Sequence, residues 1–353
     1  QRQVIDPHNG RHEEETAMKK GRKITIWVLL GLALLGLALA GTGLAMGASP
    51  YLEVGPQGIR MAGGQEMVEG LLELRGFTDL TVAAGTADVE LIPSDHYAVA
   101  YRVQGEEEIP DAQLQDGRLV LTQPGEQGFR INMGFPVSGQ DRYIRVYYDA
   151  ASALGEVELT LSCGDLTLEG VDAESIAVNA SLGNVNYRGR AQSLSFILSC
   201  GDLALQAQAD TLELDVSLGS VRMTDCSLDS VKGTLDCGDL TAGGGKIGRA
   251  ELTLHMGDFT FDGEEIGNVT YQGSCGSCTV EGKLTGSNRF TLDMGDLAIR
   301  STLPRDQYRL SLTCDMGEAR VNGAAADAQG EGQAPHSVQA QVSSGNVTAD
   351  FLS

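Results

Sequence analysis

Apolar and polar residues alternate in short runs on both sides of a recurring glycine over most of the chain. The first clear copy reads LTLSCGDLTL, with Gly164 at its centre. Alternation with a period of two is typical of a β-strand that buries one face, and its phase slips across the glycine. Each unit therefore predicts two short strands that meet at a bend, where glycine can adopt a backbone conformation that other residues avoid.

Ten copies of this unit follow one another, with 18 or 19 residues between bend glycines in the middle and 22 and then 28 at the end. One unit cannot bury its apolar face alone, whereas units stacked side by side form a continuous core with backbones about 4.8 Å apart. The repeat predicts an all-β fold, a β-solenoid (single-stranded β-helix-like) with Gly-Asp bends. The bend glycines are Gly164, Gly183, Gly201, Gly219, Gly238, Gly257, Gly276, Gly295, Gly317 and Gly345.

Positions within a unit are numbered here from its glycine. Positions −5, −3, −1, +2 and +4 are mostly apolar and are expected to face the core, whereas −4, −2, +1 and +3 are mostly polar. Position −1 alternates between cysteine and a larger residue: Cys163, Cys200, Cys237 and Cys275 against Leu182, Leu218, Met256 and Met294. This alternation fits either a coil of about 19 residues or a coil of about 37 residues with two bends. Successive cysteines would stack only in the longer coil, and in the shorter one they lie beyond disulfide reach.

A second pattern precedes the repeat, because residues 24–47 carry neither a charge nor a proline. As a helix they would span about 36 Å, enough to cross a bilayer. Lys and Arg cluster just before this run, which places the N-terminus in the cytoplasm and the rest outside the cell membrane. A cleaved signal peptide ending near Ala45–Ser49 is the alternative, although its apolar region would be unusually long. Gly43 and Gly47 form a GxxxG pair through which the helix could support a homo-oligomer.

These patterns divide the chain into five segments. Residues 1–23 form a cytoplasmic basic segment, 24–47 the transmembrane helix, 48–70 a tether, 71–150 an N-terminal β cap with the first coils, and 151–353 the repetitive solenoid. The formal net charge is −23, and residues 1–23 hold six basic and four acidic groups. The remainder therefore carries 19 basic against 44 acidic groups. Such an acidic body repels phosphate backbones and makes nucleic acid an unsuitable partner.

Aspartate recurs at position +1, so a row of carboxylates is expected along one edge. It could bind Ca²⁺ through oxygen ligands. It could instead accept backbone hydrogen bonds at each bend, as Asn184 and Ser220 would do in the same place. These uncharged replacements favour the second interpretation, and no cofactor is expected. The five aspartates are Asp165, Asp202, Asp239, Asp258 and Asp296.

The chain has seven cysteines, an odd number that rules out complete internal pairing. Cys275 and Cys278 form a lone CxxC at apolar positions, where core packing with or without a local disulfide is expected. Cys226 lies outside the pattern and is the best candidate for a free or intermolecular thiol. The chain contains no HExxH, GxSxG or GxxxxGK[ST] sequence. No catalytic residue is therefore proposed from the sequence.

The serial bends, SCGDLTLEGV and its successors, together with the preceding IRVYYDASALGEVELTL, resemble the bacterial putative-adhesin family over about residues 70–353. The resemblance implies an extracytoplasmic β-solenoid of unknown function that is often joined to a membrane helix, and some relatives look like parts of envelope-stress signalling systems. The function expected is a membrane-anchored, non-catalytic surface interaction module, adhesin-like or sensory, with an unknown extracytoplasmic protein or cell-wall partner. The alternatives are a polysaccharide-active enzyme on a β-helix and a Ca²⁺-stabilised adhesive rod.

Overall fold

The computed structural model describes residues 52–55, 58–61, 67–124, 131–133, 141–326 and 334–352. Two compact units divide the chain, one of residues Gln1–Gln65 with Gln127–Ser138 and one of Glu66–Glu126 with Gly139–Ser353. In the first unit, β1 (Leu52–Gly55), β2 (Gly58–Met61) and β9 (Ile131–Met133) form an antiparallel sheet. The expected transmembrane helix at 24–47 lies outside the described residues. Within the described ranges no helix is long and apolar enough to cross a membrane.

The regular elements in the described residues of the second unit are β-strands and two short 3₁₀ turns, Glu106–Glu108 and Arg305–Gln307, which confirms the all-β expectation. The strands of its N-terminal part are β3 (Met67–Glu73), β4 (Asp79–Ala84), β5 (Asp88–Ser94), β6 (Ala98–Gln104), β7 (Asp111–Gln115), β8 (Arg118–Thr122) and β10 (Tyr143–Asp149). Those of the repeat are β11 (Leu154–Cys163), β12 (Leu166–Leu182), β13 (Val185–Cys200), β14 (Leu203–Leu218), β15 (Val221–Thr224), β16 (Ser227–Cys237), β17 (Leu240–Gly243), β18 (Lys246–Met256), β19 (Phe259–Gly267), β20 (Val269–Cys275), β21 (Cys278–Thr285), β22 (Ser287–Met294), β23 (Leu297–Pro304), β24 (Tyr308–Met316), β25 (Ala319–Val321), β26 (Ala324–Ala325), β27 (His336–Ser344) and β28 (Val347–Leu352).

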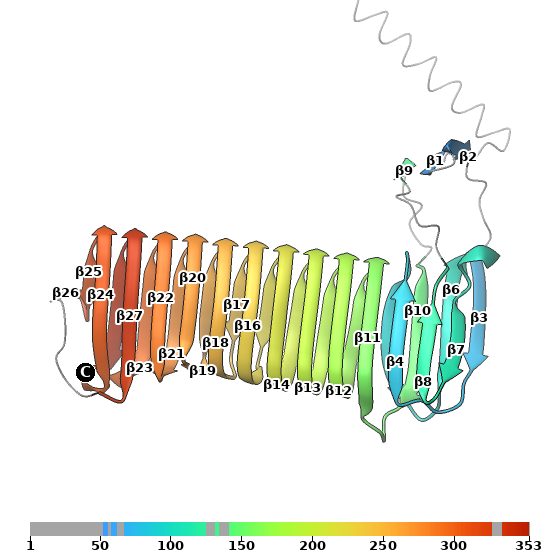
Figure 1. Ribbon diagram of the computed structural model, residues 1–353, viewed down its shortest axis with the longest axis horizontal. Coiled ribbons are helices and arrows are strands. Elements are labelled where there is room, and N and C mark those ends of the chain that lie inside the picture. The colour runs from blue at the N-terminus through green and yellow to red at the C-terminus, as the bar shows by residue number, and fades with distance from the viewer. Residues whose placement is uncertain are drawn as a thin grey trace, which may run out of the picture. The chain divides into compact units, whose positions relative to one another are not determined.

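The repeat winds in coils of 18 or 19 residues, stacked in parallel (Figure 1). Leu159 of β11 lies opposite Val178 of β12, and Leu166 of β12 lies opposite Val185 of β13. Each coil therefore contributes one strand segment before its bend and one after it, and the stacked segments form two parallel sheets with the core between them. The shorter of the two coil lengths allowed by the sequence holds, and the coil of about 37 residues is wrong.

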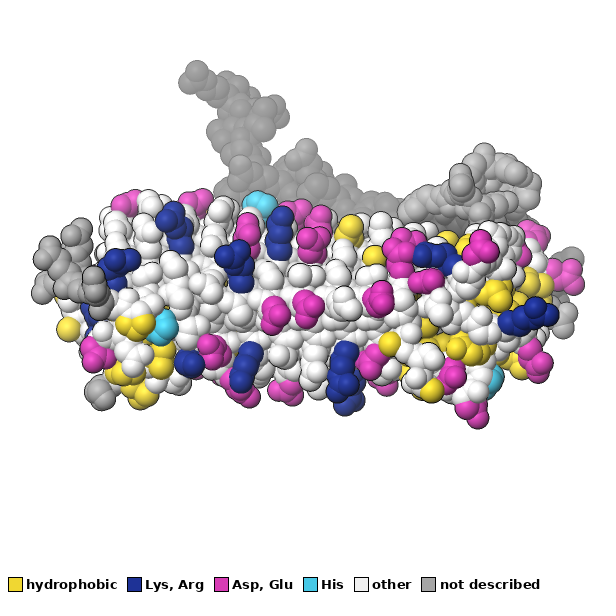
Figure 2. Space-filling view, turned by 60° about the horizontal axis from the view of Figure 1, so that its bottom comes forward, with side chains coloured by type: hydrophobic (Ala, Val, Ile, Leu, Met, Phe, Trp, Pro, Cys, Tyr) yellow, Lys and Arg dark blue, Asp and Glu magenta, His cyan; other side chains and the backbone are white. Residues whose placement is uncertain are grey.

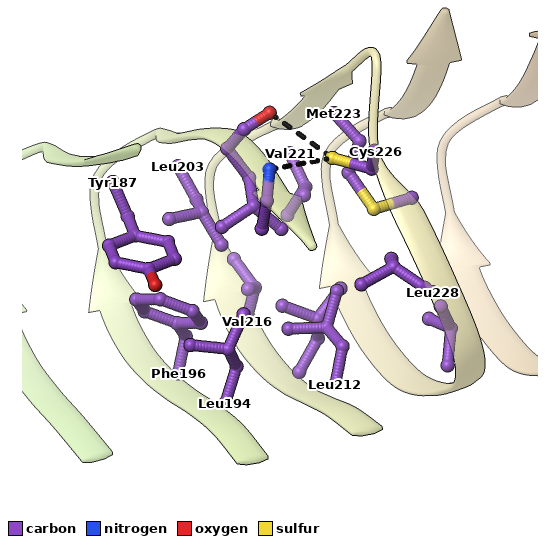
Figure 3. Close-up of a cluster of buried hydrophobic side chains, with 14 of the residues drawn as sticks. Tyr187, Leu194, Phe196, Leu203, Leu212, Val216, Val221, Met223, Cys226 and Leu228 are labelled. Carbon is purple, nitrogen blue, oxygen red and sulfur yellow. Dashed lines mark hydrogen bonds between the residues drawn. The ribbon is translucent and has the colours of Figure 1, made fainter. Parts of the chain in front are cut away.

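Buried side chains from both sheets fill the space inside each coil. In the cluster of Figure 3, Phe196 comes from the segment before a bend and Leu203 from the segment after it, and both are at most 1% exposed. The ring centroids of Tyr187 and Phe196 lie 6.1 Å apart. Each coil has only two strand segments, one on each side of its core. The neighbouring coils must therefore cover the core from above and below.

The bend glycines form a column in which only glycine fits. Gly219 has a φ of +139°, and a Cβ built on it would lie 2.0 Å from the carbonyl oxygen of Gly201 in the preceding coil. A side chain would therefore meet both an unfavourable backbone conformation and a backbone atom that cannot move aside. All ten bend glycines have positive φ.

The order of the coils departs from the order of the chain at both ends. At the N-terminal end β4 pairs with β11, and Asp165 N–H donates to Asp88 Oδ1 across 77 residues. The intervening β6, β8 and β10 cover this end, with β10 parallel to β5 and antiparallel to β6. At the C-terminal end β27 pairs with β22 on one side and β24 on the other, and β28 likewise lies between β23 and β25. The last unit of the sequence is therefore inserted as the penultimate coil.

Candidate interaction surface

One corner of every coil, from position −2 to position +1, lies on a single edge of the stack, which we call the bend edge. Successive coils align here residue by residue: Cys163 lies opposite Leu182, Leu182 opposite Cys200, and Cys200 opposite Leu218. The alignment continues to Met294, Ser344 and Met316 at the far end. The bend edge thus carries one column of side chains for each position of the motif.

Position −1 forms a column of exposed apolar side chains, which we call the apolar stripe. The expectation that position −1 faces the core is wrong. The backbone turns outward at the residue before the bend, so the side chain at −1 points to solvent although those at −3 and +2 are buried. The large members of the stripe are Leu182 (47% exposed), Leu218 (51%), Met256 (55%), Met294 (54%) and Met316 (68%). Between them lie the half-buried Cys163, Cys200, Cys237 and Cys275.

More than half of the large exposed hydrophobic residues lie on the stripe: of the nine among the described side chains, five belong to it. The face in Figure 2 carries scattered side chains of both charges, and its hydrophobic side chains gather mainly near the two ends. Contiguous exposed apolar surface on a folded protein marks a contact site more often than single exposed residues do.

Position +1 forms a ladder of hydrogen bonds on one side of the stripe. In each coil the backbone N–H at +1 donates to the side-chain oxygen at +1 of the neighbouring coil, for instance Asn184 N–H to Asp165 Oδ1 at 2.7 Å and Ser220 N–H to Asp202 Oδ1 at 2.8 Å. The rungs accepted by Ser220 and Ser277 are longer, 3.3 and 3.5 Å, because the serine side chain is shorter. The five aspartates of the sequence analysis all accept such a bond: Asp165, Asp202, Asp239, Asp258 and Asp296.

The ladder shows the +1 side chains accepting backbone hydrogen bonds, which is the interpretation that the uncharged residues at +1 favoured in the sequence. The aspartates lie in one row, as the sequence predicts, and one carboxylate oxygen of each accepts a hydrogen bond from a main-chain N–H. Among the described residues, no group of three or more His, Cys, Asp or Glu side chains is arranged to hold a metal ion.

Position −2 forms a polar column on the other side of the stripe. In the first four coils it is occupied only by serine, and further along it includes Asp236, whose Oδ1 lies 3.0 Å from Nδ1 of His255 in the next coil. The four serines are Ser162, Ser181, Ser199 and Ser217. Over the first four coils the stripe is thus flanked by hydroxyl groups on one side and by carboxylate, amide and hydroxyl groups on the other.

All seven cysteines are free. Cys163 lies opposite Leu182 rather than Cys200, so consecutive cysteines of the stripe have one whole coil between them. Cys278 of the CxxC pair is buried in the core, and burial raises the pKa of its thiol well above the ordinary value. Its neighbour Cys275 belongs to the stripe, so the expectation of core packing holds for Cys278 and not for Cys275.

Cys226 is free but not accessible, which corrects the expectation of an intermolecular thiol. Only 4% of it is exposed, and burial raises the pKa of its thiol. Its sulfur accepts a hydrogen bond from Ala207 N–H at 3.4 Å and lies 3.5 Å from the carbonyl oxygen of Leu205 (Figure 3). The thiol therefore fills a core position in a coil corner.

The family model of the Toastrack DUF4097 domain matches residues 77–350, which include every bend glycine and the strands that cover the N-terminal end. The chain belongs to this family. The Toastrack match spans the whole stack of coils and therefore the bend edge. A comparison with curated proteins finds no match.

Solved structures that are similar to this Toastrack chain share little sequence with it. They include a "putative adhesin" of Parabacteroides distasonis ATCC 8503, at 11% identity, covering 82% of this chain and 98% of that one with a TM-score of 0.43. A "putative lipid binding protein" of the same organism has 12% identity, covers 80% and 96% of the two chains, and has a TM-score of 0.42. A "putative adhesin" of Parabacteroides merdae ATCC 43184 has 12% identity, covers 82% and 97%, and has a TM-score of 0.35.

The large residues of the stripe are the surface residues that the sequence analysis missed. Residue size gives no signal for them, because the mostly buried position +2 varies from Ala to Phe, whereas position −1 holds Cys, Leu, Met and Ser. The one polar residue at position −1, Ser344, is the clue that this position is not a packed core position.

Proposed function

We propose that the chain is a single-pass membrane protein that displays its coil stack outside the cell as a non-catalytic surface interaction module, adhesin-like or sensing envelope stress. Residues 24–47 supply the membrane anchor and the basic segment 1–23 holds the N-terminus in the cytoplasm. The partner is an extracytoplasmic protein or a cell-wall component. Membership of the Toastrack family is consistent with this proposal.

One observation carries the proposal. The apolar stripe runs along an edge whose other columns are polar, with its members one coil apart in strict register. Exposed Leu and Met side chains recur at alternate coils from Leu182 to Met294, and leaving their apolar surface in water costs free energy that burial would recover. A contact surface explains their repetition, since a partner that covers the stripe recovers this free energy.

The experiment is to attach an epitope tag after Ser353 of the full chain and stain cells with an antibody before and after permeabilisation. The proposal expects staining of intact cells, and a cytoplasmic tag placed before Gln1 should stain only permeabilised cells. Staining of the C-terminal tag only after permeabilisation would reject the topology and with it the proposed function.

A further inference from the structure

The columns that flank the apolar stripe have opposite hydrogen-bonding character over the first four coils. On the −2 side lie Ser162, Ser181, Ser199 and Ser217, whose hydroxyls can donate. On the +1 side lie Asp165, Asn184, Asp202 and Ser220, of which the first three carry carboxylate or amide oxygens. Each of these carboxylates uses Oδ1 for its ladder rung, which leaves its second oxygen free to accept.

This arrangement is complementary to itself. If a second copy packs against the stripe with its coils running in the same direction, a twofold axis along the stack relates the two. That axis places the +1 column of one copy opposite the −2 column of the other at every level. Asp165 then faces Ser162 of the second copy, and Asp202 faces Ser199 of the second copy, so that carboxylates meet hydroxyl donors.

The antiparallel arrangement lacks this level-by-level match. Reversing the second copy places the +1 column opposite its own counterpart and the serines of the −2 column opposite serines. With the first four coils overlapped, Asp165 then faces Ser220 and Asp202 faces Asn184, whereas a shift by one coil brings Asp165 opposite Asp202. The parallel pair places both carboxylates of these coils opposite serine hydroxyls, and crosslinking distinguishes the two arrangements.

We infer that the apolar stripe between Cys163 and Leu218 is the contact surface for a second copy of this chain, packed in parallel. The inference rests on the proposed function, which holds two copies of the chain by residues 24–47 in one membrane. Leu182 and Leu218 of the two copies pack together and exclude water, with the serine and aspartate columns at the rim. Further along, Asp236 would face Asp239 of the second copy, so the complementarity ends after the fourth coil.

The test uses full chains in the membranes of expressing cells, each retaining one thiol of the stripe. In one chain only Cys163 remains and in another only Cys200, with the other half-exposed cysteines changed to Ser; Cys226 and Cys278 stay because their thiols are buried. A short bis-maleimide is added. The parallel pair brings each residue opposite itself, so both chains should crosslink to dimers. An antiparallel pair can bring at most one level opposite itself.

Substitutions on the stripe provide the matched control. Adding Leu182→Ser and Leu218→Ser to the Cys200 chain should lower the dimer yield at least about tenfold, because four Leu side chains are lost from the contact. Ile197→Ser removes an equally exposed residue (45%) from the outer face of β13 and should leave the yield unchanged. Crosslinking at only one of the two levels, products of another mass, or a yield that the stripe changes do not affect would overturn the inference.

The two proposals fail in different ways. A C-terminal tag that is accessible on intact cells, combined with no crosslink at Cys163 or Cys200, rejects the paired stripe and leaves the surface display intact. A tag that is inaccessible rejects the display whatever the crosslinking yields.

Discussion

Glu318 N–H donates to Asn346 Oδ1 at 3.1 Å, although Asn346 follows Glu318 by 28 residues. Asn346 in turn donates its backbone N–H to Asp296 Oδ1 at 2.7 Å. The last unit of the sequence is thereby held between the two units that precede it. Glu318 is the only glutamate at position +1, and its carboxylate accepts a bond from Arg320 of β25 at 2.7 Å instead of continuing the ladder. The terminal coil therefore ends the ladder with a longer side chain.

Asn346→Ala should destabilise the protein, because the change leaves Glu318 N–H without its acceptor and removes the 3.2 Å bond from Asn346 Nδ2 to Asp296 Oδ1. The expected loss in the free energy of unfolding is about 1–2 kcal/mol, measured by urea denaturation. Thr348→Ala, two residues further along the chain in β28, is the control and should cost clearly less. Equal losses for the two variants would argue against the inserted coil.

Gly219→Ala should cost more than about 3 kcal/mol, because the new Cβ would meet the carbonyl oxygen of Gly201 and φ is +139°. Gly243→Ala is the matched control. A Cβ there has no heavy atom within 4 Å and φ lies outside the left-handed region, so its effect should stay within about 0.5 kcal/mol. Thermal melting of both variants measures the difference, and similar midpoints would contradict the glycine column.

Two buried tyrosines should respond in opposite ways to the loss of their hydroxyl groups. Tyr187 donates to the carbonyl oxygen of Val171 at 3.1 Å, whereas the hydroxyl of Tyr271 is buried with no hydrogen-bond partner in the described part of the chain. Tyr187→Phe should therefore destabilise the protein by about 1 kcal/mol, and Tyr271→Phe should stabilise it by a similar amount. Denaturant midpoints give both values, and a loss of stability in Tyr271→Phe would show that its hydroxyl has a partner.

Removal of calcium should leave the melting midpoint unchanged. The aspartates at +1 already accept backbone N–H groups, for example from Asp258 to Asp239 Oδ1 at 2.9 Å. A ligand that binds only the folded state raises the midpoint with its concentration. Calorimetric scans with excess Ca²⁺ and with a chelator should therefore coincide. A higher midpoint in Ca²⁺, abolished by Asp239→Asn with Asp258→Asn, would restore the calcium-stabilised rod.

The repeat itself could be predicted because the local sequence of each unit is sufficient: alternation indicates two strands, and glycine indicates the bend between them. The coil length followed only from the register, since alternation of Cys163 with Leu182 fits both 19 and 37 residues. The coil order at the C-terminal end was not predictable from alternation, because the units around Gly317 and Gly345 match the pattern equally well. Glu318 was the one local clue to the terminal coil. The ladder acceptors at position +1 are Asp, Asn and Ser, which have shorter side chains than glutamate.

The outward direction of position −1 is a tertiary effect of a different kind. Period-two counting places Cys163 on the same side as the buried Leu161, and it fails where the backbone begins to turn toward a glycine of positive φ. The alternation of a strand therefore predicts side-chain direction up to position −2, and it fails at the residue directly before such a bend.

The most direct test of the exposed stripe is thiol labelling of the purified full chain with a maleimide, followed by mass spectrometry of its peptides. Cys237 and Cys275 lie on the stripe beyond the paired coils, whereas Cys226 and Cys278 are buried. The account predicts rapid labelling of Cys237 and Cys275 in the folded protein, and labelling of Cys226 and Cys278 only after denaturation. Equal protection of all four thiols, or labelling of Cys278 as fast as Cys275, would contradict it.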